Sequence, residues 1–425
     1  MARAASAESR EFTRHLVAVL DYVRAHGPCT RSSLVAGTGL SRAVVTQRVA
    51  ALLEYGLLIE AGRGPSTGGR APRTVSFSSD AGYLLTADLG ATSIDVAVAN
   101  LAGEILVHAD EPSDVAAGPN AVLSRVEELF HRCLTEVDRL PGELWGIGVG
   151  VPGPVEFETG RPIAPPIMPG WDGYRIRERF LKYGAPVWVD NDVNVMALGE
   201  LTAGVGRGQQ NLVFIKIGTG IGAGIIVDGR LQRGSQGCAG DIGHIQVPHS
   251  DREVICRCGN VGCLEALAGG AALGRDAELA ASEGRSAFLR ALLDERGSLT
   301  AADVGRAAEH GDPTSVELIT SAAREIGLAL ATVVNLLNPS RIVVGGGVAE
   351  VGDLLLATIR QTVYRRSLPL ATRHLVVERS ELGGLAGVTG AAVMVANELF
   401  SPSFLAGWLD AGTPAGHAEV AAAGA

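Results

Sequence analysis

Several features common in proteins are scarce in this 425-residue sequence. It has only six cysteines, too few for a disulfide scaffold, and three of them fall between residues 256 and 263. No apolar run reaches the roughly 18 residues that a membrane span needs, and residues 1–10 lack the hydrophobic core of a signal peptide. Lysine occurs only as Lys182 and Lys216, which we attribute to a coding bias rather than to function. These absences predict a cytoplasmic protein without a membrane partner.

The overall composition is that of a large folded protein, but its charge is unevenly distributed. Apolar residues make up 47% and charged residues 19%, so wholesale disorder is excluded, and the length predicts two or three domains. Residues 1–75 contain ten arginines and five acidic residues, a net charge of +5, whereas the rest of the chain has a net charge of −15. A small basic module joined to a large acidic one suggests that the basic part binds a polyanion.

The basic segment has the pattern of a small DNA-binding module. Apolar residues recur at helical spacing from Phe12 to His26, Thr30 can cap a second short helix, and Ser41 can cap a third. Two short strands follow, at 57–59 and 74–77, joined by a Gly- and Arg-rich connection. This order of helices and strands predicts a winged helix-turn-helix.

The third helix of this module would enter the major groove of DNA with its outward-facing residues against base edges. The wing would offer arginines to phosphates or to a narrow minor groove. The alternative is a winged helix used only for protein contacts. The expected DNA-contacting residues are Arg42, Thr46 and Gln47 on the helix and Arg63, Arg70 and Arg73 on the wing.

The acidic part contains an internal repeat. Residues 83–105 read as strand, tight turn, strand, tight turn and strand, and residues 211–231 follow the same plan. Each copy has a Gly/Thr-rich first turn. Further apolar strands alternate with helices, which indicates a largely parallel sheet in each half. The repeat predicts a duplicated, two-lobe α/β fold.

Two Gly/Thr turns facing each other across a cleft can grip a polyphosphate. Glycine backbone N–H groups can approach phosphate oxygens closely, threonines add hydroxyls, and a neighbouring aspartate can organise Mg²⁺. The alternative is that each turn is simply a tight turn. The candidate nucleotide-binding residues are Asp88, Gly90, Thr92, Gly218, Thr219, Gly220, Gly222, Gly345 and Gly346.

An acidic segment, Asp190-Asn191-Asp192, follows a predicted strand. Ligands of α/β sheets bind at the carboxyl ends of strands, and an aspartate there can take a proton from a sugar hydroxyl during phosphoryl transfer. The alternative function of these residues is to cap the helix that follows.

Three cysteines, Cys256, Cys258 and Cys263, lie in a glycine-bent loop with the spacing of soft ligands to one tetrahedral zinc. The fourth ligand must come from elsewhere, and His244 is the nearest candidate, with His249 or a water as alternatives. With no ligand position reserved for substrate, the zinc would be structural. The alternative is a set of free buried cysteines.

These motifs together resemble the ROK family (repressor, open reading frame, kinase), in its branch with an N-terminal winged helix. The resemblance covers about residues 12–398. It is carried by Asp88-x-Gly90-x-Thr92, Pro152-Gly153-Pro154, Asp190-Asn191-Asp192, Gly218-Thr219-Gly220-Ile221-Gly222-x-Gly224, Gly240-x-x-Gly243-His244 and the block from Cys256 to Glu265.

The resemblance implies a two-lobe fold of the hexokinase/actin-like (ASKHA) type and a dimer or a dimer of dimers. It implies a structural zinc held by His244, Cys256, Cys258 and Cys263, with Mg-ATP as a possible further ligand. In the kinases of the family, the residue matching Asp192 is the general base. The residues expected to bind a sugar are Asn191, Asp192, Asp241, His244 and Glu265.

The sequence departs from the kinases of the family around the sugar site. Asp241 stands where they usually have Glu, which shortens the side chain by one methylene, and the loop before Gly170-Trp171 lacks their Asn. Ala91 stands where Gly is usual and Ser93 where Lys is common, while Asp88 and the second glycine turn are kept. The phosphate-binding part is thus mostly retained and the sugar site altered.

We therefore expect a sugar-responsive, DNA-binding transcriptional regulator of carbohydrate metabolism, most simply a repressor of operator DNA. The alternative is an ATP-dependent kinase of a hexose or N-acetyl amino-sugar that carries a DNA-binding domain. The expected parts are a disordered N-terminus (1–11), a winged helix-turn-helix (12–78), lobe 1 (79–205), lobe 2 (206–400) with a C-terminal helix that can return to lobe 1, and a flexible tail (401–425).

Overall fold

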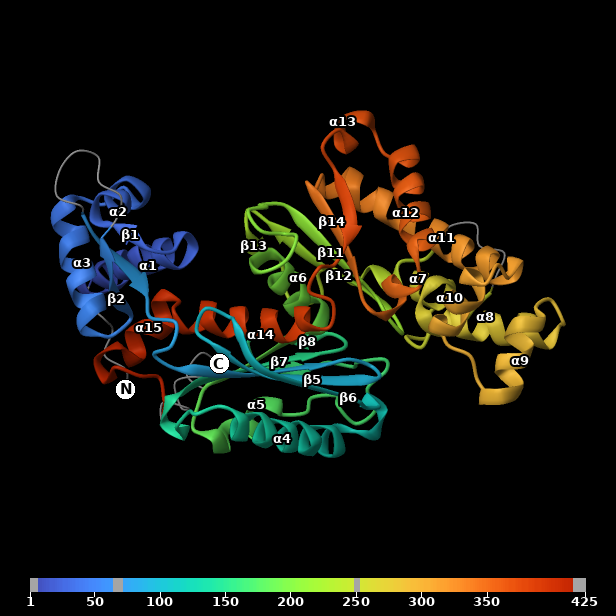
Figure 1. The fold of residues 1–425 in the computed structure, drawn as a ribbon, viewed down its shortest axis with the longest axis horizontal. Coiled ribbons are helices and arrows are strands. Elements are labelled where there is room, and N and C mark those ends of the chain that lie inside the picture. The colour runs from blue at the N-terminus through green and yellow to red at the C-terminus, as the bar shows by residue number, and fades with distance from the viewer. Residues whose placement is uncertain (1–6, 64–71, 248–252, 416–425) are drawn as a thin grey trace.

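In the computed structural model, the N-terminal module and two α/β lobes are arranged along the chain (Figure 1). The structure describes residues 7–63, 72–247 and 253–415. Arg70, predicted to contact DNA from the wing, lies outside these ranges, as does His249.

The N-terminal module consists of three helices and a small antiparallel sheet with strand order β1-β3-β2. The second and third helices begin where the sequence predicted, because Thr30 Oγ1 accepts a hydrogen bond from Ser33 N and Ser41 Oγ from Val44 N. The elements are α1 (Ala7–His26), β1 (Cys29–Thr30), α2 (Arg31–Thr38), α3 (Arg42–Glu54), β2 (Leu58–Arg63) and β3 (Arg73–Phe77). The expectation of disorder up to residue 11 is wrong for residues 7–11, which form the first turn of α1, where Glu8 is placed favourably for the helix dipole.

Lobe 1 is built on a five-stranded sheet with strand order β10-β7-β4-β5-β6. The strands β4, β5 and β6 form an antiparallel meander, and β7 and β10 extend it in parallel. One face is covered by α4, and α14 runs along the other (Figure 1). The elements are β4 (Tyr83–Leu89), β5 (Ser93–Asn100), β6 (Ile105–Pro112), α4 (Pro119–Glu136), β7 (Leu144–Val151), β8 (Val155–Glu156), β9 (Arg161–Pro162), α5 (Ile176–Phe180), β10 (Val187–Asn191) and α6 (Asp192–Thr202).

Lobe 2 has a second five-stranded sheet, in the order β13-β12-β11-β14-β15, with most of its helices on one side. The strands are β11 (Leu212–Ile217), β12 (Ile221–Val227), β13 (Arg230–Leu231), β14 (Arg341–Gly345) and β15 (Val376–Arg379). The helices are α7 (Leu264–Ala268), α8 (Gly270–Ser282), α9 (Ala287–Arg296), α10 (Ala301–Glu309), α11 (Pro313–Leu337), α12 (Asp353–Arg366) and α13 (Pro369–Thr372).

The predicted repeat is present as two equivalent meanders, β4-β5-β6 and β11-β12-β13. The first strand of each meander also pairs with a parallel strand on its other side: β4 pairs with β7, and β11 pairs with β14. In the two copies, Asp88 and Lys216 occupy the same place, just before the first glycine of the turn. Helix α6 contacts both sheets and therefore lies at the junction of the lobes.

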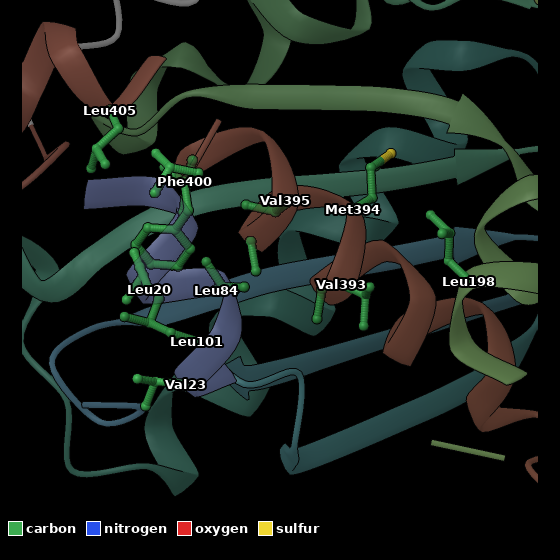
Figure 2. Packing of buried hydrophobic residues seen from close by; sticks show 14 of the residues in the cluster. Leu20, Val23, Leu84, Leu101, Leu198, Val393, Met394, Val395, Phe400 and Leu405 are labelled. Atoms are coloured by element: carbon green, nitrogen blue, oxygen red, sulfur yellow. The ribbon is translucent and has the colours of Figure 1, made fainter. Parts of the chain in front are cut away.

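The C-terminal part returns to lobe 1 and joins it to the N-terminal module. Helix α14 (Leu385–Leu399) packs against α6, β4 and β7, and α15 (Pro402–Trp408) then contacts α1. A single hydrophobic cluster contains Leu20 and Val23 of α1, Leu84 of β4 and Phe400 after α14 (Figure 2). The module and lobe 1 thus share one core.

The prediction of a flexible tail from residue 401 is wrong for residues 402–411, which are helical. Ser401 caps α15, Pro402 occupies its first turn, and Leu405 and Trp408 are buried on one face. Trp408 Nε1 also donates a hydrogen bond to Leu399 O.

Among the described helices, none is both long and apolar enough by itself to cross a membrane. Two successive helical segments, Leu385–Leu399 and Pro402–Ala411, are long and apolar enough together, but the chain bends by 71° between them.

Candidate functional site

A cleft of about 620 Å³ lies between the two lobes. Its size is that of a site for a small organic ligand. Both predicted glycine turns line it, as do the loop before the cysteines and the start of α6. All five residues predicted to bind sugar are in its wall: Asn191, Asp192, Asp241, His244 and Glu265.

Six of the nine predicted nucleotide-binding residues line the cleft: Gly90, Thr92, Gly218, Thr219, Gly220 and Gly222. Three do not, within the described residues. Asp88 is only 7% exposed and lies beneath the wall. Gly345 and Gly346 allow close packing, because a Cβ would lie 2.6 Å from the Phe214 ring at the first and 2.6 Å from the Ile217 carbonyl oxygen at the second. Gly347 lines the cleft in their place.

The glycine turns place main-chain groups at the cleft surface. Gly218 N donates to Gly220 O at 2.9 Å, which closes the second turn. The N-terminus of α8 abuts this turn, where Gly270 N donates to Gly218 O at 2.8 Å and Ala271 N to Thr219 O at 3.2 Å. The first residues of α8 and α10 also line the cleft, and helix N-termini favour anionic groups. The sequence reasoning did not include these two helices.

The acidic segment divides into one structural aspartate and one that faces the cleft. Asp190 is 2% exposed and fully engaged: its Oδ2 accepts from Arg233 Nε at 2.7 Å, and its Oδ1 from Asn194 Nδ2 at 2.8 Å. Asn191 caps α6, since its Oδ1 accepts from Val193 N at 2.9 Å, while its Nδ2 donates to Gly153 O at 3.0 Å. The capping alternative therefore holds for Asn191, although it also borders the cleft.

Asp192 forms an ion pair that the sequence reasoning missed. Lys216 Nζ donates to Asp192 Oδ2 at 2.5 Å, and the Asp192 side chain is 6% exposed. Burial opposes the charge of Lys216, but the carboxylates of Asp192 and Asp88 outweigh it and raise the pKa of Lys216 above its usual value. The signal was present in the sequence: Lys216 is one of two lysines and stands just before a glycine turn.

Asp88 is a buried carboxyl next to this ion pair. Burial raises the pKa of Asp88 to about 7; Lys216 opposes this rise, and the charges of Asp192 and Asp95 add to it. Among the described residues, Asp88 Oδ1 has no hydrogen-bond partner. Asp95 on β5 is itself paired with His108, with its Oδ1 3.2 Å from His108 Nε2.

The four predicted metal ligands converge. The ligand atoms of His244, Cys256, Cys258 and Cys263 all lie within 4.8 Å of one another. Cys258 Sγ is 3.7 Å from Cys263 Sγ, and Cys256 Sγ is 3.6 Å from His244 Nδ1. A tetrahedral zinc with ordinary bond lengths requires about 3.8 Å between two sulfurs and about 3.5 Å between sulfur and nitrogen. The donor set and spacing therefore fit a four-coordinate zinc.

The metal loop leads directly into the cleft. His244 presents Nδ1 to the cysteines and Nε2 toward Asp241, whose Oδ1 is 3.8 Å away. Glu265, which follows Cys263 closely in the chain, accepts from Ile221 N at 3.2 Å through Oε2 and packs against Gly220. An ion at the cysteines would thus fix two of the predicted sugar-binding side chains.

On the N-terminal module, helix α3 presents a polar face away from its core. Arg42, Thr46 and Gln47 are exposed, whereas Val45 and Val49 are fully buried. Thr46 Oγ1 donates to Arg42 O at 2.8 Å. On the β-ribbon, Arg73 is exposed and pairs with Glu60 at 3.0 Å.

The remaining predicted wing contact can be placed only by its main chain. Arg63 ends β2 opposite Arg73, and its side chain is outside the described part of the structure.

Comparisons with known proteins agree with this arrangement. A ROK family model matches residues 84–398. A glucokinase of Halalkalibacterium halodurans is 35% identical over 309 residues, covering 72% of this chain and 93% of that protein. A xylose repressor of Caldicellulosiruptor bescii is 30% identical over 364 residues, covering 85% of this chain and 90% of the repressor.

Two solved structures extend the comparison. A ROK family glucokinase from Streptomyces griseus, in complex with glucose and AMPPNP, has a TM-score of 0.66 at 31% identity and covers 74% of this chain and 99% of its own. A ROK family transcriptional regulator, a homolog of the E. coli MLC protein, has a TM-score of 0.79 at 27% identity and covers 94% of this chain and 100% of its own. Coverage of 94% extends into the N-terminal module. The chain belongs to the ROK family and is one of its regulators.

Proposed function

We propose that this protein is a sugar-responsive transcriptional regulator that binds operator DNA through its N-terminal module and a sugar through the cleft between its lobes. One observation carries the proposal: the module and the lobe that borders the cleft share a continuous hydrophobic core. A ligand that changes the lobe arrangement can therefore change the position of the module. The xylose repressor among its relatives supports a pentose as effector, and the glucokinase supports a hexose.

The DNA-binding part is a winged helix-turn-helix. Helix α3 would lie in the major groove, with Arg42, Thr46 and Gln47 toward the bases. The ion pair of Arg73 with Glu60 is exposed, and such pairs contribute only about 0–1 kcal/mol, so a DNA phosphate can replace Glu60 at little cost. A homodimer, or a tetramer made of two dimers, would place two such helices on two half-sites.

Helix α14 is the element that connects cleft and module. Its first turn packs on the Asp88 carboxylate, because a Cβ at Gly387 would lie 2.0 Å from Asp88 Oδ2. At its other end, Asn397 Oδ1 accepts from Arg24 Nη2 at 3.2 Å, and the Arg24 guanidinium lies 4.9 Å from the Phe400 ring centre. Fifteen residues of helix span about 22 Å. Any movement of α14 is therefore applied to α1, which carries Arg24.

Zinc held by His244, Cys256, Cys258 and Cys263 would stabilise the loop that presents His244 and Glu265 to the sugar. The described part of the module does not contact these ligands. Removing the metal is therefore expected to abolish the sugar response before it abolishes DNA binding.

The test uses the full-length, zinc-loaded protein. A DNA duplex is first selected from a random library, and its affinity is then measured with and without each sugar of a panel of pentoses, hexoses and N-acetyl amino-sugars. We expect one sugar to change the affinity at least about tenfold, which corresponds to about 1.4 kcal/mol of coupling between the sites. Glu265→Gln should lose the sugar effect but keep DNA affinity, and the exposed Glu283→Gln should behave as wild type. A protein that selects no duplex would refute the proposal.

The second candidate is an ATP-dependent sugar kinase. It is favoured by the glucokinase relatives and by the retained glycine turns in the cleft. In this case Asp192 would be the general base, and ADP release would depend on one sugar and disappear in Asp192→Asn. The ion pair between Lys216 and Asp192 argues against this candidate, because one of the two carboxylate oxygens, Oδ2, already accepts an ammonium proton.

A further inference from the structure

The side chain of Lys216 is held in the cleft by the local sheet structure. Lys216 is paired with Gly222 on β12 and with Gly345 on β14. Directly paired residues place their side chains on the same face of a sheet, so neither direct neighbour has a side chain beside the lysine. This face of the sheet looks onto the first turns of α6, since a Cβ at Gly222 would lie 2.9 Å from Val193 Cγ2. Lys216 is therefore directed at the start of α6, where Asp192 lies.

The ammonium of Lys216 lies beside two acidic side chains, Asp192 and Asp88. Asp192 receives its hydrogen bond at 2.5 Å, and Asp88 is close enough to interact with it electrostatically. Both residues are buried, with whole-residue exposures of 4% for Asp192 and 7% for Asp88, and they belong to different elements, α6 and β4. Buried carboxylates need a compensating cation, and in this chain Lys216 supplies it.

A divalent cation could also bind in such a place. Mg²⁺ is generally bound by one or two carboxylates together with substrate phosphates, and here two acidic side chains lie next to glycine turns of the kind that bind phosphates. Lys216 and such an ion would compete for the same acidic partners, and each would repel the other. The covalently attached cation is always present, whereas the divalent ion must be bound from solution.

We propose that Lys216 is a tethered cation that replaces a divalent ion between Asp88 and Asp192, so that the cleft takes its sugar without Mg²⁺ or a nucleoside triphosphate. The inference rests on the proposed function, in which the cleft binds a sugar. It makes Lys216 a specificity-determining residue: its ammonium compensates the charge of Asp192 at the cleft wall, which suits a neutral sugar and disfavours a metal–nucleotide complex.

The experiment measures Mn²⁺ binding by electron paramagnetic resonance on the zinc-loaded, full-length protein. Five proteins are compared: wild type, Lys216→Met, Lys216→Arg, Asp192→Asn and the double variant Lys216→Met with Asp192→Asn. Methionine has nearly the length of lysine without its charge, and arginine keeps the charge. We expect Lys216→Met to gain a Mn²⁺ site at least about tenfold tighter than any in wild type, Lys216→Arg to gain none, and the double variant to lose the gain.

Two results would overturn the inference. One is a Mn²⁺ site in the wild type that Asp192→Asn removes, because the divalent ion would then bind beside Lys216. The other is a Lys216→Met protein that keeps its zinc and its melting temperature but gains no Mn²⁺ site. If Lys216→Met does not fold, Lys216→Gln is interpreted in the same way, since the amide can still donate to Asp192.

The inference about Lys216 and the proposed function can fail independently. The selection of a DNA duplex by the wild type tests only the proposed function, because that selection needs no Mn²⁺. A protein that selects a duplex but fails the Mn²⁺ comparison loses only the role assigned to Lys216. A protein that selects no duplex fails as a regulator whatever its Mn²⁺ binding.

Discussion

The crossing of α6 and α14 has no room for an added methyl group, which makes Gly390→Ala a sharp test of the packing described above. A Cβ at Gly390 would lie 1.6 Å from the Val195 carbonyl oxygen and 2.8 Å from Gly199 N. On the other side of the contact, a Cβ at Gly199 would lie 2.2 Å from the Ala386 carbonyl oxygen. The obstacles are main-chain atoms of a helix, so a side-chain rotation cannot relieve them and one helix must move.

Two effects of opposite sign decide the magnitude. Alanine stabilises a helix interior by about 1 kcal/mol relative to glycine. Overpacking a buried site usually costs about 1–3 kcal/mol, and a clash with main chain belongs at or above the top of that range. Both Gly390 and its neighbours on α14 are buried. We therefore expect the free energy of unfolding to fall by about 2 kcal/mol, because the overpacking cost exceeds the gain in helix propensity.

Urea denaturation followed by tryptophan fluorescence measures this directly. Trp145, Trp188 and Trp408 are all buried around α14 and α15 and report on this region. The matched control is Gly142→Ala, because Gly142 is exposed in a short 3-10 turn and a Cβ there would have open space among the described residues. The control should stay within about 0.5 kcal/mol of wild type. A Gly390→Ala protein as stable as the control would refute the reasoning and show that α6 and α14 can move apart at little energetic cost.

Three further outcomes are expected. Because burial raises the pKa of Asp88 to about 7 while an unfolded aspartate titrates near pH 4, the folded chain holds an extra proton between these values; the free energy of unfolding should therefore fall from about pH 4 to pH 7, and Asp88→Asn should flatten that fall in denaturation midpoints. Cys263→Ser should lose its bound zinc, as measured by metal analysis, and should have a lower melting temperature than wild type. The control Cys133→Ser should keep its zinc, because Cys133 is not part of the cluster. Gln47→Ala should weaken binding to the selected duplex by about 1–3 kcal/mol and relax its sequence preference at one base pair, whereas a loss that is equal for all sequences would contradict a base contact.

Much of the cleft was predictable because its chemistry depends on residue types that have few substitutes. Glycine turns, a cysteine cluster with one histidine and an acidic segment after a strand each restrict the local backbone or the possible ligands, and the structure brings these motifs to one cleft. The internal repeat predicted the two equivalent sheets. The caps at Thr30 and Ser41 predicted the starts of two helices because a hydroxyl there satisfies a free N–H group.

The parts that could not be predicted depend on distance in three dimensions. The scarcity of lysine suggested a coding bias, and the role of Lys216 could not be predicted because its partners, Asp192 and Asp88, are far from it in the sequence. Asp88 even belongs to the other copy of the repeat. Asp88 was expected at the cleft surface, but Gly150 and Gly387 pack on its carboxylate. Helix α15 was missed because the alanine- and glycine-rich end of the chain dominated the composition there, although Ser401-Pro402 carried a helix-start signal.

The proposed coupling between sugar and DNA rests on the close packing of α6 against α14. A ligand can shift the arrangement of the lobes only by binding one arrangement better than the other, and a tenfold change in DNA affinity needs about 1.4 kcal/mol of that difference. Helix α6 begins at the cleft with Asp192 and crosses α14 through Gly199 and Gly390 at main-chain contact. A movement of α6 relative to lobe 1 cannot be absorbed at this crossing, so α14 must follow it. The end of α14 holds Arg24 of α1, which connects the proposed sugar response to the N-terminal module even though none of the module's described residues lines the cleft.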